Sequence, residues 1–181
     1  RTGINQTNQF SVGEDITRTI DPANGSIQKL YAEDTNLIIF QENKVSKSLI
    51  DKDAIYSAEG NASITSRPLV IGQNVAYAGE YGISTDPESF AVNGYRKYFT
   101  DRDQNVVCRL SMDGITVISA YGMTDYFRDK LSGAAPNIIG GWDAHNKQYV
   151  VSLVQEEFAA SEIQTLAFDE TSKGWTSFFD Y

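Results

Sequence analysis

Apolar and aromatic residues recur in short runs from Ser26 onward, and polar turns separate one run from the next. Runs of about four to eight apolar residues between turn residues are typical of antiparallel β-sheet. Asn, Asp and Gly fill many of the gaps, as at Asn93-Gly94 and Asp113-Gly114, and these residues favour tight turns. The ten Tyr and nine Phe residues also suit pleated strands. The pattern predicts an all-β fold.

Three segments, at about residues 26–58, 89–120 and 137–181, each predict an antiparallel meander of three or four short strands. A wider loop is expected at Glu156 and Glu157, between the second and third strands of the last segment. The expected strands are residues 27–32, 37–41 and 45–50 in the first segment, 90–92, 95–100, 106–111 and 115–120 in the second, and 138–142, 148–154, 163–168 and 175–179 in the third.

The three segments share a central hairpin in which an aromatic residue (Phe40, Phe99 or Trp142) precedes a polar turn and a second strand. Repeated four-stranded meanders are typical of β-propeller blades. Residues 148–154 carry large apolar side chains in both alternating sets, which suits a blade packed on both sides, although an interior strand of any large β domain has the same pattern. We expect about three propeller-like blades in uneven spacing. Since a whole propeller has roughly four to eight blades, they form an incomplete propeller.

One segment departs from the strand pattern. Residues 124–131 predict a short helix between two blades, with Thr124 as its N-cap and Phe127 and Leu131 on one face. The first 25 residues are polar and are expected to be an N-terminal connecting segment, and residues 26–181 are expected to form the propeller-like domain. We expect the 181-residue sequence to be a fragment of a longer chain.

Charge and cysteine content narrow the possible partners. The formal net charge is −9 and the cations are scattered singly, so sequence-specific nucleic-acid binding is not expected. No run of about 18 apolar residues occurs, so membrane insertion is not expected either. The single cysteine, Cys108, lies in an apolar alternating stretch and is expected to be a buried, inert thiol.

Candidate catalytic chemistry is sparse. The single histidine, His145, lies in an expected turn with no nucleophile placed beside it, so we expect no enzyme and no zinc site. Asp101, Asp103 and Asn105 place oxygens at alternate positions, as at the start of a calcium loop. Val106 stands where such a loop needs glycine and Met112 where it needs Glu. A plain hairpin turn is therefore expected, with these three residues as the alternative calcium site, and no cofactor is expected.

A second motif concerns glycan processing. Residues 111–116, which include Asp113 and Gly114, are similar to the Asp box of sialidase propellers but have one residue too few before the glycine, and no Trp follows. The seven arginines are dispersed, and no pair of carboxylates stands out as a glycosidase pair. These departures count against a sialidase-like glycosidase, which stays as the least favoured of the possible functions.

Several dispersed blocks resemble a segment of tail proteins of tailed bacteriophages. The resemblance is to the propeller of the muzzle or nozzle protein that closes the tail of short-tailed phages, including crAss-like phages, and it covers about residues 26–181. The blocks that carry it are residues 82–90, 98–101, 109–119, 121–127 and 174–179. The residues singled out as a structural motif are Tyr98, Phe99, Asp101, Arg109, Leu110, Ser111, Asp113, Gly114, Gly141, Trp142, Gly174 and Trp175.

The resemblance implies a virion structural protein that assembles in the bacterial host cytoplasm into the phage tail. Its expected partners are other tail and virion proteins and copies of itself, in a ring around the DNA exit channel. The main alternative is a receptor- or glycan-binding tail module in which exposed Trp142, Trp175 and tyrosines stack on sugars. Aromatic residues packed between blades favour the structural role, and an exposed groove lined by Trp with paired carboxylates favours the alternatives.

Overall fold

The computed structural model describes residues 18–50, 55–56, 62–63, 71–132, 137–157 and 160–180. In this part of the chain the protein is all-β, with one α-helix, as the hydrophobic pattern predicts. Three antiparallel four-stranded sheets follow one another along the sequence. A small separate hairpin consists of β4 (Ile55–Tyr56) and β5 (Ala62–Ser63).

The first sheet has the strand order β1-β2-β3-β6. Its strands are β1 (Ile27–Glu33), β2 (Asn36–Gln41), β3 (Val45–Leu49) and β6 (Asn74–Ala76). The first three agree with the predicted strands within a residue or two. The sequence pattern did not predict β6, which pairs with β3 through Ser46 and Ala76 although about 25 residues separate the two strands.

The second sheet has the order β10-β9-β8-β7 and is buried on both faces. Its strands are β7 (Ala91–Asn93), β8 (Arg96–Asp101), β9 (Val106–Ser111) and β10 (Gly114–Val117). Phe99 and Cys108 pair across β8 and β9 and pack toward the first sheet. Their neighbours Tyr98 and Val107 point the other way, toward the third sheet. Burial on both faces explains why apolar residues occupy both alternating sets of these strands.

The third sheet has the order β11-β12-β13-β14. Its strands are β11 (Asn137–Asp143), β12 (Gln148–Glu157), β13 (Ala160–Asp169) and β14 (Gly174–Asp180). The expected loop at Glu156 and Glu157 is wrong, because β12 continues through both residues and pairs with β13 as far as Ala160. This end of the hairpin extends beyond the residues that pair with β11.

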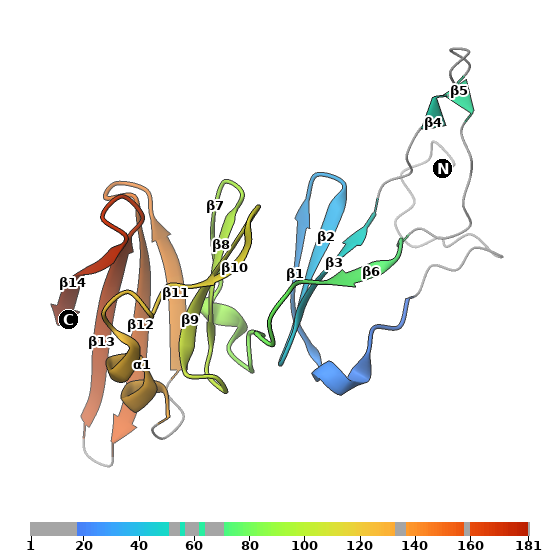
Figure 1. Cartoon of the computed structure of the whole chain (residues 1–181). Coiled ribbons are helices and arrows are strands. Elements are labelled where there is room, and N and C mark those ends of the chain that lie inside the picture. Colours follow the sequence, from blue (N-terminus) through green and yellow to red (C-terminus); the bar gives the residue numbers. More distant parts are fainter. Residues whose placement is uncertain are drawn as a thin grey trace, which may run out of the picture.

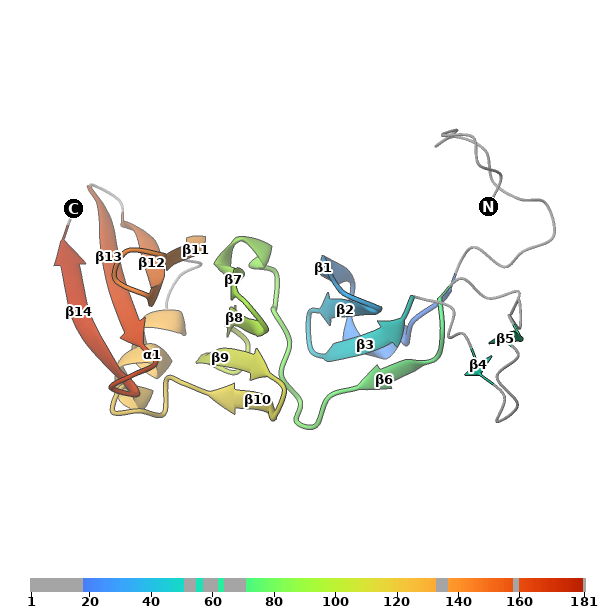
Figure 2. The same ribbon diagram turned by 90° about the horizontal axis from the view of Figure 1, so that it is seen from above.

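The three sheets stand side by side along the molecule (Figure 1). Seen from above, their first strands β1, β7 and β11 lie along one side; β6 and β10 lie along the opposite side, and β14 lies at the outer end of the molecule (Figure 2). Two hydrophobic cores separate the sheets. Phe40, Phe99 and Leu110 lie in the core between the first and second sheets, and Tyr98, Tyr149 and Phe168 lie in the core between the second and third.

Helix α1 (Thr124–Leu131) has the predicted bounds and inserts Phe127 and Leu131 into the second core. The prediction that Thr124 is the N-cap is wrong, because Met123 occupies that position and no side chain caps the helix there. Backbone bonds from Met123 to Ser119 and from Phe127 to Met123 hold this end of the helix instead. The sequence also predicts that Gly133 supplies a left-handed exit from the helix, and this residue lies outside the described residues.

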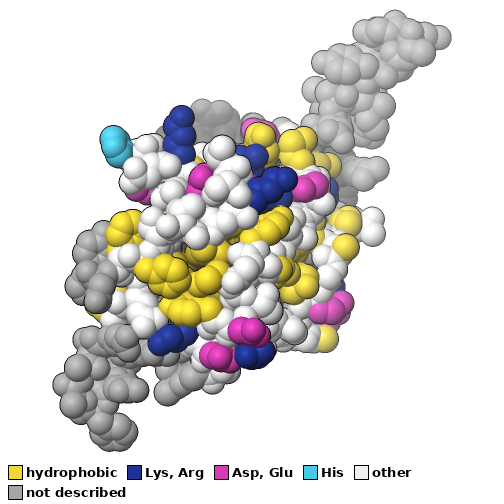
Figure 3. Space-filling view, turned by 60° about the vertical axis from the view of Figure 1, so that its left-hand side comes forward, with side chains coloured by type: hydrophobic (Ala, Val, Ile, Leu, Met, Phe, Trp, Pro, Cys, Tyr) yellow, Lys and Arg dark blue, Asp and Glu magenta, His cyan; other side chains and the backbone are white. Residues whose placement is uncertain are grey.

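The outer face of the third sheet remains partly exposed. Ile139, on β11, is 51% exposed, and Ile163 is exposed on β13. Both lie on the face opposite the core, as do Val150 and Val154. Figure 3 turns the third-sheet end of the molecule towards the viewer and shows hydrophobic side chains exposed there. In the described residues the face of the second sheet toward the first, by contrast, is well covered.

Candidate functional site

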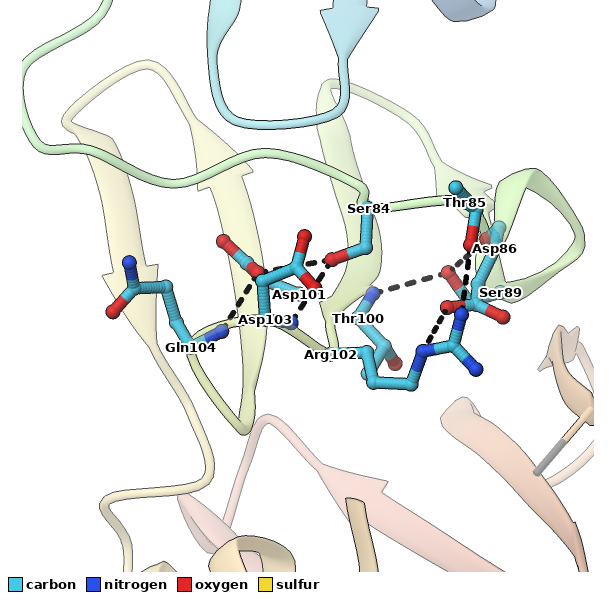
Figure 4. Close-up of polar contacts among 9 residues, drawn as sticks. All are labelled: Ser84, Thr85, Asp86, Ser89, Thr100, Asp101, Arg102, Asp103 and Gln104. Atoms are coloured by element: carbon cyan, nitrogen blue, oxygen red, sulfur yellow. Dashed lines mark hydrogen bonds and ion pairs between the residues drawn. The ribbon is translucent and has the colours of Figure 1, made fainter. Parts of the chain in front are cut away.

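The candidate calcium residues lie at the end of β8 and in the turn that follows it. The Asp101 carboxylate accepts hydrogen bonds from neighbouring residues of the protein (Figure 4). Its Oδ2 accepts the backbone N–H of Gly82 at 2.9 Å. Its Oδ1 accepts the Ser84 hydroxyl at 3.1 Å and the backbone N–H of Gln104 at 3.0 Å. Asp101 is buried, and burial raises the pKa of its carboxyl group above the ordinary value. Its carboxylate therefore joins the connection before β7 to the end of β8.

The other two calcium candidates, Asp103 and Asn105, lie in the same turn after Asp101. Asp103 is exposed, and its backbone N–H donates to the Ser84 hydroxyl at 3.1 Å. Asn105 adopts a left-handed conformation, with a φ of 57°, and closes the turn through a backbone bond to Arg102. Among the described residues, no three His, Cys, Asp or Glu side chains come together in a cluster that could hold a metal ion.

The connecting segment 82–90, which we call the junction segment, contacts all three sheets. Backbone bonds from Ile83 and Ser84 to Gln41 and Glu42 attach it to the β2–β3 turn of the first sheet. Asp101 attaches it to the second sheet. A Cβ added at Gly82 would lie 1.9 Å from the Glu42 carbonyl oxygen, so only glycine fits between the junction segment and this turn.

The second half of the junction segment is the short 3-10 turn η2 (Pro87–Ser89). The Ser89 hydroxyl accepts the backbone N–H of Thr100 at 3.1 Å, and Arg102 pairs with Asp86 at 3.2 Å (Figure 4). Burial raises the pKa of Asp86, and Arg102 opposes this shift. These contacts fix η2 against the end of β8.

The third sheet reaches the junction segment through Tyr149 and Gly140. The buried Tyr149 hydroxyl donates to the Ser89 carbonyl at 2.8 Å. Gly140 passes so close that an added Cβ would lie 2.0 Å from the same carbonyl oxygen and 2.8 Å from the Tyr149 hydroxyl. Ser89 thus links the two sheets, through Thr100 of the second and Tyr149 of the third. Burial raises the pKa of Tyr149, so its hydroxyl remains a donor.

A second polar contact joins the second and third sheets through Tyr98 in the middle of β8. Glu170, in the β13–β14 turn, accepts the Tyr98 hydroxyl at 2.8 Å and pairs with Arg109 at 2.9 Å. The side chains of Arg109 and Glu170 are only 17% and 15% exposed. The Arg109 Nε has no hydrogen-bond partner. Burial, and next the hydrogen bond to Glu170, raise the pKa of Tyr98.

Replacing Glu170 with alanine is expected to lower the free energy of unfolding by about 2 kcal/mol, because it leaves a largely buried guanidinium without its main partner. Tyr98→Phe, which removes only the hydroxyl, is expected to cost about 1 kcal/mol. Urea unfolding of the two single variants and the double variant measures this. The double variant should cost clearly less than the sum of the two, and strict additivity would show that the three groups do not act together.

Both tryptophans are packed between sheets. Trp142 stacks on Tyr98, with ring centroids 5.6 Å apart, and Tyr98 stacks in turn on Tyr149 at 4.8 Å. Trp175 contacts Phe127 and donates its ring N–H to the Ile118 carbonyl at 3.1 Å. The rings that the sequence offered for stacking on sugars therefore serve contacts between the second and third sheets.

The remaining motif residues occupy strands and turns of the same sheets. Phe99 and Leu110 are buried toward the first sheet, and Ser111 ends β9. Asp113, in the β9–β10 turn, lies 3.5 Å from Arg109, and Gly114 has a φ of 102°, which favours glycine. Gly174 begins β14, and Gly141 faces open space, with nothing within 4 Å of an added Cβ. Cys108 is buried, as predicted, and burial raises the pKa of its thiol.

His145 is exposed in the turn between β11 and β12, as predicted. The carboxylate of Asp143 holds this turn by accepting the backbone N–H groups of His145 and Asn146, at 2.8 and 3.2 Å. The imidazole ring takes no part in these bonds.

His145→Ala is therefore expected to change the free energy of unfolding by no more than about 0.5 kcal/mol, as at other exposed sites. Asp143→Ala should have the larger effect, because it removes the acceptor that holds the turn. Thermal unfolding of both variants compares the two. A larger loss for His145→Ala would show that the ring has a role the contacts do not reveal.

Sequence reasoning missed four residues that join the sheets: Gly82, Ser89, Gly140 and Glu170. Each acts across a long sequence separation, such as the 72 residues between Tyr98 and Glu170. The local pattern carries no signal for Ser89 or Glu170. The Gly140-Gly141 pair was visible as two glycines inside a strand, which often mark a close backbone approach.

No family model matches the chain, and a search of curated proteins finds no match. No helix in the described residues is both long and apolar enough to cross a membrane.

Proposed function

We propose that this chain is a non-enzymatic structural module of a bacteriophage tail, whose sheets are blades of a propeller-like ring around the DNA exit channel. The observation that carries the architectural part is the order of the strands in space. Each four-stranded sheet runs from its first to its last strand in chain order, and the first strands β1, β7 and β11 lie along the same side of the molecule (Figure 2). Propeller blades are arranged in this way around a central axis.

Ring closure requires further blades. Roughly four to eight blades make a propeller, and the described part of the chain supplies three such sheets. The remaining blades come from a longer chain or from neighbouring copies, and the outer face of the third sheet is where the next blade packs. The tail assignment itself rests on the resemblance of the dispersed sequence blocks to muzzle and nozzle proteins.

The environment of the tryptophans favours assembly over glycan recognition by these rings. Trp142 and Trp175 are partly buried and pack against the core between the second and third sheets, which leaves less of each ring free to stack on a sugar. The acidic character of the chain, with a net charge of −9, also suits a channel that DNA passes without binding. The proposed partners are other tail proteins and further copies in the virion.

Electron cryomicroscopy of the particle that contains this chain tests the proposal. The map should show four-stranded sheets arranged around the tail axis, with the first strand of each sheet nearest the axis and another blade against Ile139 and Ile163. A chain that is absent from the particle, or that lies away from the DNA path, would refute the tail role.

A further inference from the structure

A groove opens between the first and second sheets, at the end where the β1–β2, β7–β8 and β9–β10 turns lie. Its volume is about 460 Å³, within the range of roughly 300–1,000 Å³ typical of small-ligand sites. Buried Ile38 and Leu110 form part of its lining. The groove lies away from the junction segment and from the contacts between the second and third sheets.

The groove contains an ion pair that is already fixed in position. Lys97, whose side chain is only 3% exposed, pairs with Glu33 and donates to the Tyr95 carbonyl at 3.0 Å. Its ammonium group also lies over the Tyr31 ring, at 5.5 Å. The Glu33 carboxylate is held by Lys97, and because the Glu33 side chain is 29% exposed, it is still accessible from the groove. Such a preorganised acceptor needs little further ordering to bind a hydroxyl group.

Two tyrosines supply flat apolar surface beside this pair. Tyr95 is 52% exposed at the β7–β8 turn, and Tyr77 is half-buried against the first core. The Arg96 guanidinium lies 5.6 Å from the Tyr95 ring and the Lys47 ammonium 5.8 Å from the Tyr77 ring. Burial, together with the charge of Glu33, raises the pKa of Tyr77, so its hydroxyl remains a hydrogen-bond donor.

The charges that line the groove balance. Lys47 and Lys97 are matched by Glu33 and Asp34, so the groove has no excess charge to attract a phosphate, a nucleic acid or a strongly acidic sugar. Asn36 and Ser111 add uncharged polar groups. The combination of tyrosine rings with fixed donors and acceptors suits a ligand that has both apolar faces and many hydroxyl groups. We infer that this groove binds a neutral oligosaccharide, a ligand that the proposed tail role does not itself require.

Saturation-transfer NMR and calorimetry on the 181-residue chain, with maltohexaose, cellohexaose and chitohexaose as probes, test the inference. At least one probe should bind saturably. Saturation of the aromatic protons of the protein should be transferred to the protons of that sugar. Tyr95→Ala should weaken binding about 10-fold or more, as truncation of an aromatic anchor commonly does. Asn36→Ala should weaken it as well. Tyr121→Ala is the matched control, since Tyr121 is 40% exposed far from the groove, and it should leave the affinity unchanged.

Three outcomes would overturn the inference: no saturable binding of any of the three probes, the same affinity in Tyr95→Ala as in the unchanged chain, or tighter binding of dextran sulfate than of the neutral sugars. Circular dichroism of Tyr95→Ala and Asn36→Ala, recorded alongside, shows that the variants remain folded. None of these outcomes bears on the tail role, because that role rests on the arrangement of the three sheets and on the sequence resemblance, and sugar binding in the groove enters neither.

Discussion

Gly140→Ala is expected to lower the free energy of unfolding by about 3 kcal/mol, near the upper end of what overpacking commonly costs. The added Cβ would lie 2.0 Å from the Ser89 carbonyl oxygen and 2.8 Å from the Tyr149 hydroxyl. Neither is the free end of a flexible side chain, since one is backbone and the other belongs to a buried ring. Relief of the clash must move β11 away from η2 and break the Tyr149–Ser89 hydrogen bond.

The adjacent glycine provides the control. Gly141 lies on the opposite face of the same strand, and an added Cβ there meets nothing within 4 Å. Gly141→Ala should therefore change stability by less than about 1 kcal/mol and can be stabilising. Urea unfolding of both variants, followed by tryptophan fluorescence, separates them. Equal effects at the two positions would show that the third sheet does not rest on Ser89.

The second large effect is expected at Asp101. Asp101→Ala removes the acceptor of three hydrogen bonds, from Gly82, Ser84 and Gln104, and should lower the free energy of unfolding by about 3 kcal/mol. The control is Asp103→Ala in the same turn, since the Asp103 side chain is exposed and its loss should cost no more than about 0.5 kcal/mol. If the two variants proved equally stable, the junction segment would not depend on the Asp101 carboxylate.

The pH dependence of Asp101 has a definite sign. Burial raises the pKa of its carboxyl group in the folded protein above the ordinary value. As the pH falls, the folded state therefore takes up the proton before the unfolded state does, and this group increases stability. Compared with the uncharged Asp101→Asn variant, the unchanged chain should gain stability between pH 7 and about pH 4. Urea unfolding at several pH values measures the difference, and a relative loss towards low pH would contradict the buried environment.

The strands and the helix could be predicted because they depend on local pattern. The bounds of Val106–Ser111 and Thr124–Leu131 agree with the predicted ranges, since alternation and helical spacing are visible within a few residues. The short strand β6 could not be predicted, because the three residues Asn74–Ala76 carry no measurable periodicity and pair with a distant partner. The far end of the β12–β13 hairpin was missed because the polar sequence there shows no apolar alternation.

The contacts between sheets could not be predicted from the sequence, for a different reason. Asp101 was singled out for its oxygen, but its partners Gly82 and Ser84 lie 19 and 17 residues earlier. Tyr149 reaches Ser89 across 60 residues. Which side chains meet depends on how two independently patterned sheets are placed against each other, and that placement is a tertiary property with no local signature.

Sedimentation velocity of the purified chain tests most directly whether the sheets are blades that require further neighbours. The exposed Ile139 and Ile163 on the outer face of the third sheet should drive association, because an uncovered apolar sheet face usually marks an interface. We predict species larger than the monomer, and a shift towards monomer in Ile139→Lys, which places a charge on that face without disturbing the core. A stable, unassociated monomer with cooperative unfolding would contradict the account, because the three sheets would then form a complete domain.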